Sequence, residues 1–285
     1  MKIFVLFSAL LAVSYAEQCV YGEAGSQPQS LVTCKSVTTA TMGNNIKLND
    51  KSGPFESVTD LELTNFTGTL DSNTLSMFPK LKRLSIQDSN FPKISSVVFE
   101  KCCKDLKILS IRNNMATTIE AGTFKNLKEL EELHLSNKIP KLSKDLLEGL
   151  VALKKLTLRK TKINEVDEDA FENMKTLETL ELYDNTFPVI KPKTFAPLTE
   201  LKKLSILDNP NLKLFPLDLL KEQKKLELLG LPVDILSKIE VATLKKQFPS
   251  LKKLEIKVDD KKKYENMLQQ VEKEQMIISY LGDYV

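Results

Sequence analysis

A repeating pattern of apolar residues constrains this chain more than any other feature of its sequence. Nine segments share the pattern apolar-x-x-Leu-x-apolar, and successive segments begin 23 to 25 residues apart. They begin at Val58, Leu81, Leu106, Leu130, Leu153, Leu177, Leu201, Leu226 and Leu251. A period of this length indicates a repeat architecture, because one such unit cannot bury its apolar face alone.

Two further apolar columns keep the same register along the chain. One column lies 12 or 13 residues after each start and contains Ile94 and Ile190, and the other lies 17 or 18 residues after it and contains Phe124 and Phe195. Each unit is therefore expected to form a short strand whose alternate residues point inward, then a turn and a return segment. We predict a solenoid in which the units stack on one another.

The units resemble the extracellular type of leucine-rich repeat, LxxLxLxxNxLxxLxxxxFxxL, found in Toll-like receptor ectodomains and in secreted invertebrate leucine-rich immune proteins. The closest unit is 177–198, with Asn185 at the asparagine position and Phe195 at the phenylalanine position. The resemblance covers residues 58–258. It implies an α/β solenoid, a horseshoe with a concave parallel sheet of about nine strands. The asparagine that bonds neighbouring loops in the family is kept only at Asn114, Asn185 and Asn209.

The first sixteen residues have the pattern of a signal peptide. Lys2 is followed by an apolar run over 3–13, and the small residues Ser14 and Ala16 precede a cleavage site at Glu17. Eleven apolar residues are too few to cross a bilayer, which needs about 20. We therefore expect a secreted, extracellular protein without a membrane anchor.

Residues 17–57 lie outside the repeat register and are expected to form an N-terminal cap. They contain Cys19 and Cys34, which we predict to be joined by a disulfide that closes this cap, in place of the four cysteines common in the family. Cys102 falls at a core position of its repeat, so Cys103 is left over. A disulfide between these adjacent residues, a link to the cap and a free or intermolecular thiol all remain open.

Asn65 begins the only Asn-x-Ser/Thr sequon with a permitted middle residue, Asn65-Phe66-Thr67. In a secreted chain this is a predicted glycosylation site. Because it follows the first strand, a sugar there would shade the N-terminal edge of the concave face.

The tail, residues 259–285, leaves the repeat and has a helical pattern. Tyr264, Met267, Val271, Ile278 and Leu281 fall on one seam. We expect a C-terminal helical cap over the last repeat. The alternative is a short coiled coil that joins two chains in a dimer, although Glu274 interrupts its seam.

The candidate binding surface lies on the outward residues of the predicted strands, which face the concave side. The middle of the arc brings together six of them: Arg112, His134, Arg159, Glu181, Tyr183 and Leu207. Arginine and tyrosine are enriched in the binding hot spots of interfaces. We predict that these residues contact a ligand, and that an exposed His134 titrates near pH 6.5.

Composition argues against several other functions. The 41 Lys and Arg are mixed with 38 Asp and Glu, so no block of charge indicates nucleic acid, and one His with four Cys leaves few ligands for a metal. No cofactor motif and no catalytic pairing can be recognised, and nothing places two carboxylates together in a cleft. We predict a non-enzymatic binding protein for a protein or microbial surface ligand. The resemblance implies innate immunity, and the alternative is an extracellular matrix component or an enzyme inhibitor.

Overall fold

The computed structural model describes four short N-terminal strands and residues 55–67, 69–90, 93–114, 118–257 and 262–280. The N-terminal strands are β1 (Cys19–Tyr21), β2 (Leu31–Lys35), β3 (Lys47–Leu48) and β4 (Lys51–Ser52). The predicted signal peptide, residues 1–16, lies outside the described residues. Within them, no helix is both long and apolar enough to cross a membrane.

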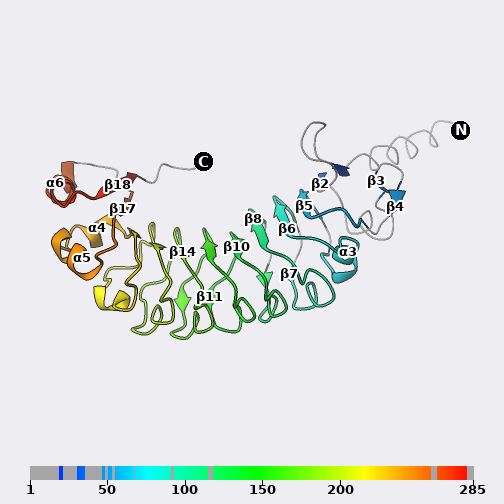
Figure 1. The fold of residues 1–285 in the computed structure, drawn as a ribbon, viewed down its shortest axis with the longest axis horizontal. Coiled ribbons are helices and arrows are strands. Elements are labelled where there is room, and N and C mark those ends of the chain that lie inside the picture. Colours follow the sequence, from blue (N-terminus) through cyan, green and yellow to red (C-terminus); the bar gives the residue numbers. More distant parts are fainter. Residues whose placement is uncertain are drawn as a thin grey trace, which may run out of the picture.

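Every one of the nine repeat segments forms a strand of one sheet. These strands are β5 (Asp60–Thr64), β6 (Arg83–Gln87), β8 (Ile108–Arg112), β10 (Glu132–Leu135), β12 (Lys155–Leu158), β14 (Thr179–Glu181), β15 (Lys203–Ser205), β16 (Leu228–Gly230) and β17 (Lys253–Ile256). With β1, β2 and β18 (Ile277–Tyr280) they make a 12-stranded sheet among the described residues, and only the β1–β2 pair is antiparallel. The sheet lines the inner edge of an arc (Figure 1). The predicted leucine-rich repeat solenoid is confirmed.

The sheet is held in register by leucines that stack from strand to strand. Leu133 of β10 pairs with Leu109 on one side and with Leu156 on the other, and all three are fully buried. The phenylalanine column fills the space behind the sheet, where the rings of Phe171 and Phe195 lie 6.1 Å apart. Each repeat therefore buries its apolar face against its neighbours, as the period predicts.

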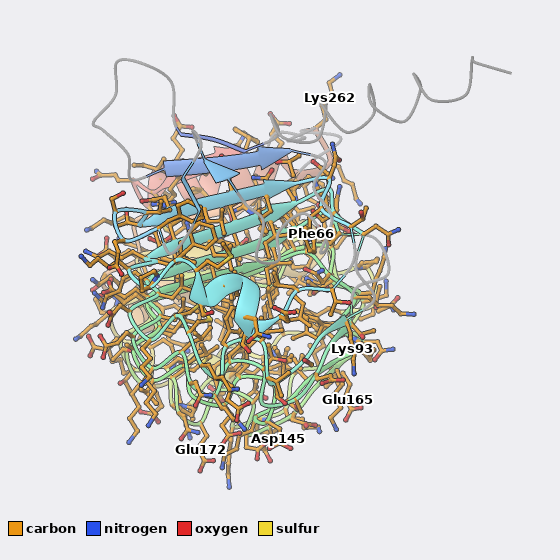
Figure 2. The ribbon with its side chains drawn as sticks, turned by 90° about the vertical axis from the view of Figure 1, so that its right-hand side faces the viewer. Phe66, Lys93, Asp145, Glu165, Glu172 and Lys262 are labelled. Carbon is orange, nitrogen blue, oxygen red and sulfur yellow. A yellow bond between two sulfur atoms is a disulfide. The ribbon has the colours of Figure 1, made fainter. Side chains whose placement is uncertain are left out.

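The outer side of the arc consists of loops and short elements. They are α3 (Ser72–Ser76), β7 (Lys93–Ile94), β9 (Thr118–Ile119), β11 (Lys141–Leu142), β13 (Glu165–Val166), the 3-10 helix η1 (Leu217–Leu220), α4 (Val233–Leu236) and α5 (Val241–Gln247). Lys93, Glu165 and Glu172 lie on this side (Figure 2), where they pair with Glu120, Lys141 and Lys144. This side is therefore a solvated, ion-paired surface.

The three asparagines kept at the ladder position bond the loops of successive repeats. Asn185 accepts from the backbone N–H of Ile163 (3.1 Å) and donates to the carbonyl of Leu158 (2.9 Å). Asn114 accepts from the N–H of Ser89 (2.8 Å), and Ser89 in turn accepts from the N–H of Phe66 (3.0 Å). A buried serine thus replaces asparagine in its repeat, because its hydroxyl also satisfies a backbone donor.

The C-terminal tail differs from the long helix that its sequence pattern predicts. The 3-10 helix η2 (Lys262–Tyr264) leads into α6 (Glu265–Lys273), and β18 then adds a parallel strand beside β17. Tyr264, Met267 and Val271 are buried in the chain's own core. The helix therefore caps the last repeat. Burial of these three seam residues favours the cap over the alternative of a coiled coil, and a dimer through this helix stays a prediction.

The N-terminal cap is described only by its strands. Strand β1 pairs antiparallel with β2, and Cys19 lies opposite Cys34 in this register. Strand β2 then pairs parallel with β5 and so extends the repeat sheet by one strand. The register agrees with the predicted Cys19–Cys34 disulfide, whose side chains lie outside the description, and the bond stays a prediction.

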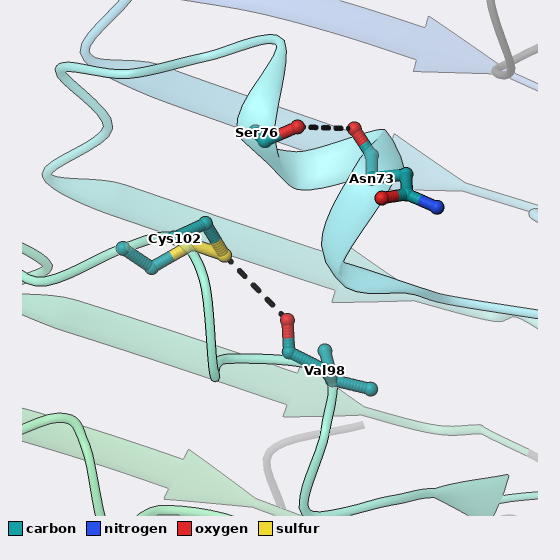
Figure 3. Close-up of a disulfide and its surroundings, with 5 residues drawn as sticks. Asn73, Ser76, Val98 and Cys102 are labelled. Carbon is teal, nitrogen blue, oxygen red and sulfur yellow. Dashed lines mark hydrogen bonds between the residues drawn. A yellow bond between two sulfur atoms is a disulfide. The ribbon is translucent and has the colours of Figure 1, made fainter.

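Cys102 and Cys103 form a disulfide between adjacent residues. Both are buried, and Sγ of Cys102 lies 3.5 Å from the carbonyl oxygen of Val98 (Figure 3). Cys103 has a φ of 65°, which turns the chain before Leu106 enters the core. Of the alternatives that the sequence left open, the structure contains the adjacent pairing.

Candidate functional site

A hollow of about 400 Å³ lies on the concave face in the middle of the arc. It spans the repeats of β6, β8, β10, β12 and β14. Its lining is mostly polar and charged: Gln87, Arg112, Asn113, His134, Leu135, Ser136, Lys155, Thr157, Arg159, Lys160, Glu181 and Tyr183. Five of the six predicted contact residues line it, and only Leu207 does not.

The two arginines stand at equivalent positions of repeats that flank the repeat of β10. Arg112 ends β8 and is exposed, and Arg159 follows β12 and is half-buried. Between them, at the same position, stands the small residue Ser136. The guanidinium of Arg159 lies over the ring of Tyr183, 5.1 Å from its centroid. This cation–π contact is attractive and stabilises the position of the Arg159 side chain.

His134 is buried, which corrects the expectation of an exposed histidine. Only 7% of the residue is exposed, and its Nε2 lies 3.2 Å from Oε2 of Glu132 on the same strand. Burial lowers the pKa of His134 below its usual 6.5 although Glu132 opposes the shift, and the charges of Arg112 and Lys155 lower the pKa further. The imidazole is therefore neutral at pH 7, and the positive charge of the hollow comes from arginine and lysine.

Glu181 belongs to an ion-pair network that closes the C-terminal side of the hollow. Its carboxylate accepts from Thr157 (3.1 Å) and pairs with Lys203 (2.6 Å), and Lys203 also reaches Glu255 (3.4 Å). Burial would raise the pKa of Glu181, but the ammonium of Lys203 outweighs it and holds that pKa below the usual value. The fold thus unites two carboxylates that the sequence does not place together. Lys203 bridges both of them.

Gly230 makes this network fit on the strand between Lys203 and Glu255. A Cβ atom there would lie 2.8 Å from Oγ of Ser205 and 3.0 Å from Oε2 of Glu255. Such distances are shorter than ordinary van der Waals contact, so any other residue would displace Ser205 or Glu255. The network reaches from Lys203 on β15 across β16 to Glu255 on β17, because β16 ends in a glycine.

The prediction of Leu207 as a contact residue is wrong. Leu207 is 1% exposed and does not line the hollow. The next residue, Asp208, pairs with Lys257 two strands further along (3.2 Å), so polar side chains close the concave face at this point. An apolar side chain in this position gains free energy by being covered.

The sequence analysis did not predict the rest of the lining, which includes the cationic residues Lys155 and Lys160 and the amide of Asn113. Lys155 opens β12, two residues before Thr157, and therefore faces the same side. Asn113 and Lys160 occupy the turn after the strand, where φ is 54° and 56°. Asn113 and Lys160 directly follow the predicted contact residues Arg112 and Arg159, and Lys155 lies four residues before Arg159, so a wider window around each predicted residue would have found all three.

The cations of the hollow differ from other lysines along the arc. Lysines at one flank of the sheet pair with glutamates of a neighbouring repeat, such as Lys202 with Glu178 (2.8 Å). Arg112, Lys155 and Lys160, in contrast, form no ion pair with any residue that the structure describes. Four cationic side chains and one carboxylate line the hollow, and the carboxylate is held by Lys203. The hollow is therefore positively charged.

The fold defines the protein as a leucine-rich repeat solenoid with a hollow on its concave face. The family model described as BspA type Leucine rich repeat region matches residues 28–117 and 92–227, in six copies. The chain belongs to this family. It is also similar in fold to the protein in the crystal structure of a TLR13-ssRNA13 complex, with a TM-score of 0.52 and 22% sequence identity. The match covers 70% of this chain and 32% of that one, so this chain spans about a third of its length.

Proposed function

We propose that this is a secreted, non-enzymatic binding protein that recognises a protein or microbial surface ligand through its concave hollow. Leucine-rich repeat solenoids are typically binding scaffolds, and the family membership supports the general class. Secretion is supported by the signal-peptide pattern of residues 1–16. We further propose a role in innate immunity, which the resemblance of the repeats to those of Toll-like receptor ectodomains supports.

One observation carries the proposal: cations without an ion pair to any described residue gather in a hollow whose other side chains are mostly polar. Among the residues that the structure describes, Arg112, Lys155 and Lys160 lack the acidic partners that lysines at the flank of the sheet have. Unpaired like charges repel one another and lower stability unless a ligand neutralises them. The arrangement therefore favours a binding role over a purely structural one.

The test compares binding of the secreted protein to microbial cells and to immobilised extracellular matrix. Arg112, Arg159 and Tyr183 are replaced together by Ala, which leaves the buried leucines untouched. The matched control replaces Lys125 and Lys128, which are exposed on the return segment after Phe124. We expect the triple variant to bind its target about 30-fold more weakly, equivalent to about 2 kcal/mol. The control should bind as the wild type does.

Two outcomes would contradict the proposal. Unchanged binding of the triple variant, with an unchanged circular dichroism spectrum, would move the binding site away from the hollow. If the protein bound only to the extracellular matrix, and the triple variant bound as well as the wild type, the alternative function as a matrix component would be favoured instead.

A further inference from the structure

The hollow contains a gap between two arginines that suits an anionic group. Arg112, Ser136 and Arg159 occupy equivalent positions of three consecutive repeats, and the strands β8, β10 and β12 are paired in parallel. Neighbouring strands lie about 4.8 Å apart, so the backbones of the two arginines are about 10 Å apart across Ser136. The hydroxyl of Ser136 already accepts from the N–H of Asn113 (2.9 Å), which fixes it low between them. Guanidinium groups bind carboxylate, sulfate and phosphate through paired N–H donors.

The hollow lacks the apolar anchor that a protein hot spot needs. Leu207 is covered, and the ring of Tyr183 lies under Arg159. None of the exposed large apolar side chains of the described residues lines it: Val97, Val151, Val189, Leu214, Ile277 and Tyr280. Protein interfaces place aromatic and aliphatic anchors at their centre, with charge at the rim. The ligand that this surface fits is therefore hydrophilic.

The remaining lining side chains suit a ligand rich in hydroxyl groups. Gln87 and Asn113 are exposed amides on the N-terminal side of the gap. Each amide can both donate and accept, as pairs of vicinal hydroxyls require. A volume of about 400 Å³ lies in the lower part of the range of small-ligand pockets, roughly 300 to 1,000 Å³. The hollow thus accommodates a short polar segment and is too small for a folded surface.

We propose that the hollow binds an acidic saccharide, a sugar chain that bears carboxylate or sulfate groups. This inference rests on the proposed function, since it names the ligand class of the same site. One acidic group lies between Arg112 and Arg159, and Lys155 and Lys160 compensate further charge along the chain. The sugar hydroxyls form hydrogen bonds with the side-chain amides of Gln87 and Asn113.

The test measures the affinity of the full secreted chain for defined probes by isothermal titration calorimetry at physiological salt. The acidic probes are a heparin-derived hexasaccharide and hexagalacturonate, and the neutral probe is chitohexaose. Two further probes are also polyanions but are not acidic saccharides. An oligoglutamate peptide carries carboxylates without sugar rings, and a single-stranded oligothymidylate carries its charge on phosphodiesters. We expect at least one acidic saccharide to bind at least tenfold more tightly than chitohexaose and than either of the last two probes.

Charge-matched variants separate recognition from general attraction. Arg112→Gln with Arg159→Gln should weaken binding of the acidic saccharide at least tenfold, and Lys125→Gln with Lys128→Gln should change it less than twofold. An equal loss in both variants, or binding of no acidic saccharide, would overturn the inference. So would tighter binding of the peptide or of the oligonucleotide. If either then lost affinity in the arginine variant, the proposed function would stand and only the saccharide would be wrong.

Discussion

Replacing Asn185 by Ala should unfold this solenoid at a much lower denaturant concentration, because it removes a bonded link between two successive repeats. The side chain is 1% exposed. It accepts from the N–H of Ile163 (3.1 Å) and donates to the carbonyls of Leu158 (2.9 Å) and Leu182 (3.1 Å). A buried backbone group that loses its partner costs about 1 to 3 kcal/mol. The replacement leaves the N–H of Ile163 and the carbonyl of Leu158 without these partners. We therefore expect the free energy of unfolding to fall by about 3 kcal/mol.

The assay is urea unfolding followed by circular dichroism at 222 nm, with Asn211→Ala as the matched control. Asn211 also donates to a backbone carbonyl of the preceding repeat, that of Thr186 (2.8 Å), but it is exposed. Water replaces a lost bond there, so the control should change the free energy of unfolding by less than about 0.5 kcal/mol. If the two variants were equally stable, the asparagine ladder would contribute nothing and the reasoning would be refuted.

Three further predictions concern the hollow and the covalent state. In the unfolded chain His134 takes up a proton near its ordinary pKa of about 6.5, whereas the buried side chain does so only at lower pH. The free energy of unfolding should therefore fall as the pH drops from 7.5 to 5.5. His134→Gln should remove this pH dependence in urea titrations. Thr157→Asp should cost about 2 kcal/mol relative to Thr157→Asn at pH 7, since it faces Glu181 in a covered site, and equal stability would contradict the network. The intact mass of the secreted protein should correspond to a chain that begins at Glu17, carries a glycan on Asn65 and loses four hydrogens to two disulfides; a free thiol would refute the cysteine assignments.

The fold could be predicted because its determinants are periodic. Inward leucines such as Leu133 and Leu156 recur at nearly constant intervals, and equivalent positions are buried in successive repeats. The tail could not be predicted in the same way. Its apolar seam extends from Tyr264 to Ile278, but Gln275 adopts a φ of 54°, which ends the helix and allows β18 to join the sheet. One residue in a left-handed conformation is not visible in a hydrophobic pattern.

The candidate site could be predicted in position but not in accessibility. Alternation along a strand gives the side to which Arg112, His134 or Leu207 points, and that side is correct for the residues that line the hollow. A concave sheet, however, crowds its outward side chains against one another. His134 and Leu207 are covered for this reason, and Glu255, which occupies in β17 the position that His134 occupies in β10, is 7% exposed. Exposure depends on the sizes of side chains one or two repeats away, which a single column does not reveal.

The central claim, that the hollow is the binding surface, is tested most directly by site-specific photocrosslinking. A benzophenone side chain is placed at Gln87, which is exposed and lines the hollow, or at Val189, which is 58% exposed but does not line it. Each protein is irradiated with the microbial cells or extracellular material that it binds. The account predicts crosslinked ligand from position 87 and none from position 189. Crosslinking from position 189 alone would contradict it.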